Sequence, residues 1–392
     1  MDLSVNIAGI KLRSPIIASS SVDGMDGERI VTVSARKLGA SITKTIVKNM
    51  QTDVLPNIKR VRGDSMINCV FGTNLTARQW FEEEFPKAKK AGIPIIANMA
   101  GTTPEEAIEL AKGCEAAGAD MIEYPTACPH MGNILEAMFP GLKVPLPEVN
   151  DPSDYARQIE AVKKAVKIPV MAKFSSIYHL TCKEWAKAVE DAGGDAISAA
   201  DSIGPVMDID VETGQPVLGG PRGYSGLTGA AIRPLVLRMV LEITETVNIP
   251  VIGIGGISTG EEAAQFIMAG ASAVALSSAA LLKGSQVYSD VYDGLEAFME
   301  RKGYTSLADF KGLTHRRIEE RKAKGRQIIK DVVVPTLVPD KCIACGLCRR
   351  ACPYGAISAD GGKPVFDPAV CHGCGLCVSV CASKAIGQEY YE

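Results

Sequence analysis

The chain has 392 residues, of which 46% are hydrophobic, and a formal net charge of −3. This length allows about two or three domains, and the intermixed acidic and basic residues argue against a nucleic-acid partner. No run reaches the roughly 18 consecutive apolar residues of a membrane span, and the N-terminal segment lacks the pattern of a secretory leader. We therefore expect a cytoplasmic protein with no membrane association, whose cysteines stay reduced.

A repeat of helix, small-residue turn and short apolar stretch runs through the first three quarters of the chain. Glycine just past a helix end is a capping signal, and proline is tolerated at the first residue of a strand. Both signals precede apolar stretches that are typical of strands buried on both faces. We expect eight strands, near residues 15–19, 40–45, 94–99, 119–124, 168–174, 195–200, 249–254 and 272–277.

Eight β/α units over residues 1–303 predict a (β/α)8 TIM barrel, with an open doubly wound sheet as the alternative. Residues 3–13 predict a hairpin across the barrel bottom, and residues 103–117 predict a helix capped by Thr102 or Thr103. Residues 304–335 predict a polar helical connector. Its basic residues are either a solvated helix surface or a docking site.

Glycines and serines follow the last two predicted strands, where TIM barrels often bind phosphate. Gly255 and Gly256 come after the seventh strand, and Ser277 and Ser278 come after the eighth, each pair before a predicted helix. Backbone N–H groups at such helix starts bind anions, so we predict a phosphate site there. A Rossmann nicotinamide site is not predicted, because no G-x-G-x-x-G opens a helix after an early strand.

Ionisable side chains follow three other strands. Lys44 and Lys173 stand at the ends of the second and fifth strands, where a cation could stabilise a reduced flavin or form a salt bridge at the rim. Cys128 follows the fourth strand; it could donate a proton to a substrate carbon, or pack as an apolar side chain. His130 could bind an anionic group of a substrate.

Two runs of four cysteines occupy residues 336–392 with the spacing by which bacterial ferredoxins hold two [4Fe–4S] clusters. In that arrangement the fourth cysteine of each run ligates the other cluster. Two structural zinc sites are the alternative, but zinc sites commonly use separated cysteine pairs. We therefore predict a ferredoxin-like domain whose first cluster is held by Cys342, Cys345, Cys348 and Cys381, and whose second is held by Cys371, Cys374, Cys377 and Cys352.

Taken together, these motifs resemble the dihydroorotate dehydrogenase superfamily, and the barrel followed by two cluster motifs is similar to dihydropyrimidine dehydrogenases. The resemblance rests on Thr43-Lys44-Thr45, Ala172-Lys173 and Cys128-Pro129, together with the glycine and serine loops. It also rests on residues 226–234, which the resemblance implies to be a loop. It implies a bound FMN and Cys128 as the acid that protonates the substrate. It also assigns residues to the two ligands: FMN would contact Ala18, Ser19, Lys44, Thr45, Lys173, Gly226, Gly229, Gly255, Gly256, Ser277 and Ser278, and substrate would contact Asn68, Asp201 and Ser202.

The chain departs from the family pattern at the substrate positions. Pro125 and Asp201 stand where the family has asparagines, which puts a pyrimidine ring substrate in doubt. The apolar segment after Cys128 is either a lid over the barrel or a wall for a larger substrate.

The leading hypothesis is an FMN-dependent reductase of a C=C bond conjugated to a carbonyl in a small cyclic substrate, with electrons arriving through the clusters. The alternatives are a reductase of a non-pyrimidine enone or aromatic acid, a tRNA dihydrouridine synthase-like enzyme, and a non-catalytic electron-transfer protein. We also expect an electron-donor partner, either an NAD(P)H-oxidising flavoprotein subunit or a ferredoxin, and a homodimer or higher oligomer.

Overall fold

The computed structural model describes residues 1–49, 53–125, 151–220, 222–323 and 332–389. The chain divides into two compact units, Met1–Arg317 and Ile318–Glu392. No helix of the described residues is long and apolar enough to cross a lipid bilayer.

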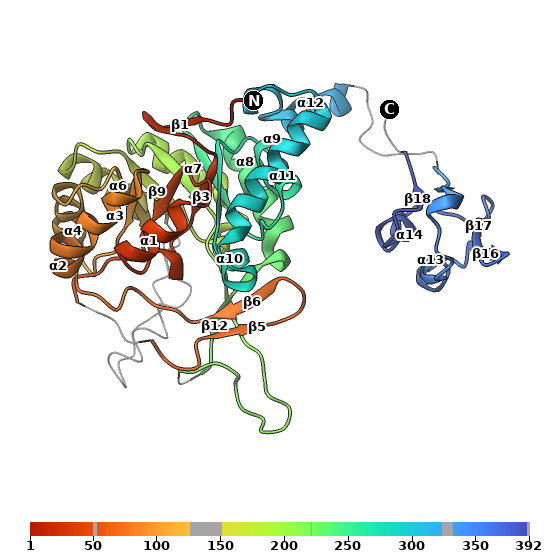
Figure 1. Ribbon diagram of the computed structural model, residues 1–392, viewed down its shortest axis with the longest axis horizontal. Coiled ribbons are helices and arrows are strands. Elements are labelled where there is room, and N and C mark those ends of the chain that lie inside the picture. The colour runs from red at the N-terminus through yellow and green to blue at the C-terminus, as the bar shows by residue number, and fades with distance from the viewer. Residues whose placement is uncertain (50–52, 126–150, 221, 324–331, 390–392) are drawn as a thin grey trace. The chain divides into compact units, whose positions relative to one another are not determined.

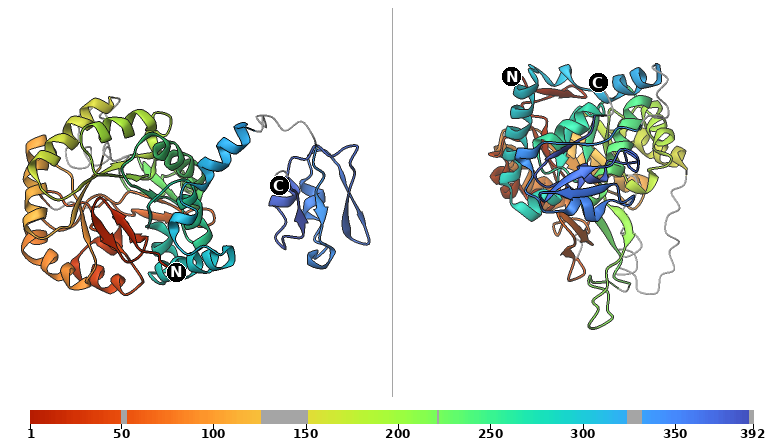
Figure 2. Two further views of the ribbon diagram at one scale, coloured as in Figure 1. Left: turned by 90° about the horizontal axis from the view of Figure 1, so that it is seen from above. Right: turned by 90° about the vertical axis from the view of Figure 1, so that its right-hand side faces the viewer.

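The first unit contains a closed barrel of eight parallel strands, surrounded by helices (Figure 2). All eight predicted strands are present, so the predicted TIM barrel is confirmed and the open sheet is excluded. In chain order the barrel strands are β3 (Ile16–Ala18), β4 (Ala40–Ile42), β7 (Ile95–Asn98), β8 (Met121–Pro125), β9 (Val170–Phe174), β10 (Ala196–Ala199), β13 (Val251–Ile254) and β14 (Ala273–Leu276).

Alternating side chains of these strands build two apolar layers. The first fills the barrel interior with residues such as Ile42, Met121 and Met171, and the second packs the outer faces of the strands against the helices. The covering helices are α1 (Gly27–Ser34), α2 (Ala77–Gln79), α3 (Phe85–Ala88), α4 (Pro104–Ala116), α6 (Pro152–Ala165), α7 (Cys182–Asp191), α8 (Arg233–Thr246), α9 (Gly260–Met268), α10 (Ser278–Lys283) and α11 (Gln286–Lys302). Thr103, rather than Thr102, caps α4, because its side chain accepts a hydrogen bond from the backbone N–H of Glu106.

The two ends of the barrel carry different antiparallel elements (Figure 1). At one end lies the predicted hairpin of β1 (Val5–Ile7) and β2 (Ile10–Leu12), whose Ile7 and Leu12 pack against the interior cluster. The other end carries a four-stranded sheet that the sequence analysis did not predict. Its strands, in spatial order, are β11 (Ile203–Val206), β12 (Ser225–Gly229), β6 (Ser65–Asn68) and β5 (Ile58–Arg60).

Strand β12 corrects the expectation that residues 226–234 form a loop. The first half of this segment pairs with β6 instead, with Gly226 opposite Asn68 and Gly229 opposite Ser65. Gly229 has φ 88°, and a Cβ there would lie 2.2 Å from the carbonyl oxygen of Asp64. Only glycine fits this close pairing. In the sequence alone, the same glycine is typical of a loop.

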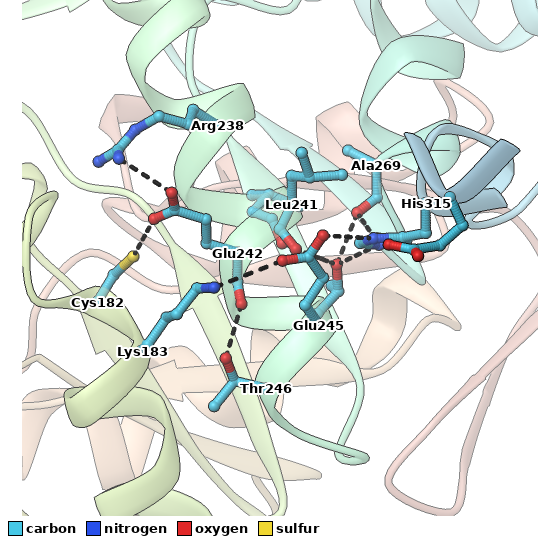
Figure 3. A network of polar contacts seen from close by, with 12 residues as sticks. Cys182, Lys183, Arg238, Leu241, Glu242, Glu245, Thr246, Ala269 and His315 are labelled. Carbon is cyan, nitrogen blue, oxygen red and sulfur yellow. Dashed lines mark hydrogen bonds and ion pairs between the residues drawn. The ribbon is translucent and has the colours of Figure 1, made fainter. Parts of the chain in front are cut away.

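A polar network ties the start of α12 (Leu313–Ala323) to the barrel helices (Figure 3). His315 lies between the carboxylate of Glu245 on α8, at 3.3 Å, and the carbonyl oxygen of Ala269, at 3.1 Å. The same helix α8 presents Glu242 to Cys182, whose pKa is raised to about 12 by burial and by that carboxylate. These contacts fix the first turn of α12 within the barrel unit.

The second unit repeats one local motif around each cysteine run. A glycine with positive φ, Gly346 or Gly375, precedes a short helix that carries the third cysteine of its run. The elements are β15 (Thr336–Leu337), which pairs with β18 (Ile386–Gly387), β16 (Ile357–Asp360), which pairs with β17 (Lys363–Phe366), and the helices α13 (Leu347–Ala351) and α14 (Leu376–Ser379).

The structure predicts that strand β13 tolerates no side chain at Gly253. A Cβ there would lie 2.4 Å from the ring of Phe266, which is fully buried on α9. Gly253→Ala should therefore lower the free energy of unfolding by about 1–3 kcal/mol. Urea unfolding followed by tryptophan fluorescence measures this loss, because both tryptophans, Trp80 and Trp185, belong to the barrel unit.

Phe266→Leu provides the control for this prediction. In the double variant Gly253→Ala/Phe266→Leu the smaller side chain should relieve the clash, so the two losses should be less than additive. Strict additivity would show that the glycine and the ring do not constrain each other.

Candidate functional site

Two adjoining cavities open at the carboxyl ends of the barrel strands. They share Ser20, Thr228 and Ser277 in their linings, so one continuous surface joins them. The first is also lined by Ser19, Lys173, Ala200, Asp201, Ser202, Gly229, Ile232, Ile254, Gly255, Gly256, Ile257, Ala275, Leu276 and Ser278. The second is also lined by Ser21, Val22, Lys44, Ile58, Met66, Asn68, Val70 and Leu281.

The floor of the first cavity is a cradle of glycine and serine backbone. Gly256 has φ 69°, and a Cβ there would lie 2.6 Å from the carbonyl oxygen of Gly229. Ser277 is the N-cap residue of α10, directly after β14. Helix α9 begins later than the sequence suggested, at Gly260 with Thr259 as its cap, so Gly255 and Gly256 form a separate turn before the helix. A turn without side chains lets a ligand approach the backbone closely.

Lys173 and Asp201 lie next to each other in the lining of the first cavity. Lys173 is the fourth residue of β9, and Asp201 follows β10. Their Nζ and Oδ2 atoms are 3.9 Å apart, and the other carboxylate oxygen of Asp201 accepts the backbone N–H of Ser202 at 2.7 Å. The lysine therefore forms an ion pair at the rim while it still lines the cavity, so the two sequence interpretations of Lys173 are compatible.

Lys44 and Asn68 line the second cavity from two different elements of the barrel unit. Lys44 follows β4 and is almost completely buried, with its Nζ 3.5 Å from the carbonyl oxygen of Val70. Asn68 ends β6, and its side-chain amide donates to the carbonyl oxygen of Gly226 at 3.4 Å. The unpredicted four-stranded sheet is thus the element that carries Asn68 over the barrel mouth.

A buried polar group inside the barrel was missed by the sequence analysis. Glu123 on β8 is completely buried and accepts hydrogen bonds from the amide of Asn98 and, at 2.7 Å, from the hydroxyl of Ser198. Among the described residues, the amide oxygen of Asn98 has no hydrogen-bond partner. The sequence does contain a signal for this group. Asn98, Glu123 and Ser198 are polar residues in three largely apolar strands, on the faces that point into the barrel.

Some predicted site residues do not meet in these cavities. Ala18 ends β3 with its side chain in the outer apolar layer, and neither Thr45 nor Gly226 lines either cavity. Cys128 and His130 lie outside the described residues. Ser20 and Thr228 were missed, although both line the two cavities.

The first cavity fits the phosphate and ring of a flavin mononucleotide. Its glycine–serine cradle offers backbone N–H groups to an anion, and Lys173 supplies a cation. The donor set therefore suits a ligand with one phosphate and a polar ring.

In the second unit, eight cysteines line two separate cavities. One cavity is lined by Cys342, Cys345, Cys348 and Cys381, and the other by Cys352, Cys371, Cys374 and Cys377. The fourth cysteine of each run thus lies beside the first three of the other run. Among the described residues, no three His, Cys, Asp or Glu side chains converge closely enough to hold a single metal ion. Four thiols around a wider space suit a [4Fe–4S] cluster better than zinc.

The balance between burial and hydrogen bonding differs between Cys381 and two more buried cluster cysteines. Burial raises the pKa of the Cys348 and Cys377 thiols. Burial would also raise the pKa of Cys381, but hydrogen bonds from Ser383 and from backbone N–H groups, including that of Ala385 at 3.2 Å, lower it overall. Such donors stabilise negative charge on a ligating sulfur.

Comparisons with known proteins agree with this geometry. Residues 2–299 match the family model described as dihydroorotate dehydrogenase, and residues 319–385 match the 4Fe-4S dicluster domain. Three relatives carry the name "Dihydroorotate dehydrogenase B (NAD(+)), catalytic subunit". The protein from Caldicellulosiruptor saccharolyticus is 34% identical over 80% of this chain and 99% of its own length. The protein from Methanosarcina mazei is 33% identical over 80% of this chain and 95% of its own length. The protein from Endomicrobium trichonymphae is 32% identical over 78% of this chain and 95% of its own length.

The pairing of the cysteine runs can be tested by single substitutions. Iron and labile sulfide analysis of the wild-type protein should give about eight of each per chain. Cys352→Ser should then alter the same cluster as Cys374→Ser, because both cysteines line one cavity. The electron paramagnetic resonance spectra of these two reduced variants should agree with each other and differ from that of Cys345→Ser. If Cys352→Ser instead matches Cys345→Ser, each run holds its own cluster.

Proposed function

The chain belongs to the dihydroorotate dehydrogenase family, and on this premise we propose that it reduces, or in reverse forms, a C=C bond conjugated to a carbonyl in a small cyclic substrate. Members of this family are FMN-dependent oxidoreductases that act on CH–CH bonds, and this chain is such an oxidoreductase with an additional dicluster domain. The proposal therefore concerns the substrate, the residues and the electron donor.

The observation that carries the proposal is the continuous lining of the two cavities. Ser20, Thr228 and Ser277 join the glycine–serine cradle to the pocket of Lys44 and Asn68. A phosphate in the cradle would leave the ring end of the cofactor beside this second pocket, where a flat substrate could stack against it. When bound, FMN supplies hydride transfer, and the clusters supply electrons one at a time.

Asn68 and Asp201 are the groups that we assign to substrate recognition. Asn68 offers a donor and an acceptor, which pairs well with the amide or imide edge of a ring. Asp201 offers acceptors only, and one of its oxygens already accepts the Ser202 N–H. Asp201 in place of the family asparagine therefore favours a substrate that presents an N–H or a cationic group. Such rings include the pyrimidines of a dihydropyrimidine dehydrogenase-like reaction.

Cys128 is the residue to which we assign proton donation, on sequence grounds alone. It follows strand β8, whose carboxyl end belongs to the catalytic face of the barrel. Its Sγ would donate a proton to the substrate carbon next to the one that receives hydride. His130, two residues further on, is the alternative donor.

Cys128→Ser should retain flavin and clusters but lose about 10²- to 10⁴-fold in turnover, because a hydroxyl is a much weaker acid than a thiol. The measurement is anaerobic turnover, with reduced methyl viologen as donor, on a panel of unsaturated cyclic imides, enones and aromatic acids. His130→Ala is the matched control and should retain most of its turnover. The opposite ranking of the two variants would assign the proton to His130.

The dicluster domain supports a separate electron donor as part of the proposal. The curated relatives are named catalytic subunits of an NAD(+)-linked enzyme, and the match covers 95–99% of their length but only 78–80% of this chain. This chain therefore has additional sequence, which includes cluster-binding motifs. We propose that a partner protein, either a flavoprotein subunit or a ferredoxin, delivers electrons to this domain, and that the chain acts as a homodimer or larger assembly.

Purified protein alone should not oxidise NADH or NADPH, because no nicotinamide-binding motif is present. Reduced methyl viologen should bleach the flavin absorbance under the same anaerobic conditions, since a small dye needs no docking site. Rapid bleaching by NADPH without a partner would show that the chain has a nicotinamide site, and would refute this part of the proposal.

A further inference from the structure

The two cluster cavities of the second unit differ in the charge that surrounds them. All five lysines and arginines of residues 332–389 border the segments that line the first cavity, the one containing Cys345. These residues are Lys341, Arg349, Arg350, Lys363 and Lys384. All five are exposed, and within the described part of the chain none has a carboxylate within ion-pair distance.

The second cavity, which contains Cys374, has no such border. Near its lining segments stand one acid, Asp367, and one cation, Arg350, which lies two residues before Cys352 and is shared with the first border; the other flanking residues are uncharged. Its exposed side chains include Tyr354, which stacks on His372 with ring centroids 4.2 Å apart. The unequal charge is therefore a property of one cluster site and not of the unit as a whole.

Exposed apolar side chains lie between Lys341 and Arg349 along the segment that lines the first cavity. Ile343, directly after Cys342, is 68% exposed, and Leu347 on α13 is 41% exposed. Both line the first cavity. The guanidinium of Arg350 lies against the same turn, with its Nη1 3.1 Å from the position that a Cβ on Gly346 would occupy. An apolar centre with a charged rim is the usual anatomy of a protein interface.

We propose that this surface, defined by Ile343, Leu347 and the five surrounding cations, docks a small acidic one-electron carrier protein of the ferredoxin type. Unpaired rim cations attract an acidic partner over a distance and orient it, while the small apolar centre permits rapid release. Electron-transfer complexes use contacts of this modest size. The inference rests on the proposed function, because it assigns the face of the cluster domain at which the donor binds.

Calorimetry of the anaerobic full-length holoprotein with an oxidised acidic [2Fe–2S] ferredoxin tests the proposal. Binding should weaken steeply as salt rises. Arg349→Glu/Arg350→Glu should weaken it roughly 10- to 100-fold, because two attractive charges become repulsive. The control Lys90→Glu/Lys112→Glu changes the net charge equally on exposed positions of the barrel unit, and should bind within about twofold of wild type.

Lys341→Glu/Lys384→Glu is a second variant of the same surface, and it replaces the first should Arg349→Glu/Arg350→Glu fail to assemble its clusters. Loss of affinity confined to these variants supports the proposal. Equal affinity in wild type and both surface variants, or tight binding of basic cytochrome c in place of the ferredoxin, overturns it. Flavin bleaching by methyl viologen distinguishes failure of the proposed function from failure of the docking proposal. If the dye does not bleach the wild-type flavin, the proposed function is contradicted. The docking surface is decided by calorimetry alone.

Discussion

Closure of the eight-stranded barrel is the constraint on which the active site depends. Because all eight strands are parallel and each hydrogen bonds to two neighbours, their carboxyl ends must meet at one rim. Side chains that are far apart in the sequence are therefore brought together by the backbone of the barrel. Lys173 lies near the carboxyl end of β9, and Asp201 follows the neighbouring strand β10. Gly256 and Ser277 follow the next two strands around the ring. The interior below the rim is filled largely by apolar side chains, so a ligand binds at the rim and not inside the barrel.

Most polar groups at this rim are positioned by the scaffold, and Lys173 and Asp201 also pair with each other. Asn68 reaches the barrel mouth on a separate antiparallel sheet, and this sheet requires Gly229 to pass within contact distance of Asp64. Below the rim, Glu123 is fixed inside the barrel by hydrogen bonds from Asn98 and Ser198. The pocket is thus largely formed before a ligand arrives, so that little ordering entropy is lost when a flat cofactor binds.

The second unit obeys a different physical rule. It has a small apolar core in which cluster cysteines themselves take part, together with Ile357 and Ile386. A unit of this size buries little apolar surface, so the bonds between thiolate and iron are expected to supply much of its stability. The surface residues around the two cluster sites can therefore differ without loss of stability. In the docking proposal, the cations near the first cavity determine at which cluster electrons enter.

The sequence by itself determined the elements whose signals are local. Small-residue turns followed by apolar stretches located all eight barrel strands, and cysteine spacing predicted the two cluster sites and their crossed pairing. Only the tertiary structure revealed the four-stranded sheet, the buried group of Asn98, Glu123 and Ser198, and the cavity linings of Ser20 and Thr228. These features depend on partners that are distant in the sequence, such as Asn98 with Glu123, 25 residues apart, and Thr228 with Met66, 162 residues apart. Local propensity carries no information about such partners, because barrel closure alone decides which strand faces which.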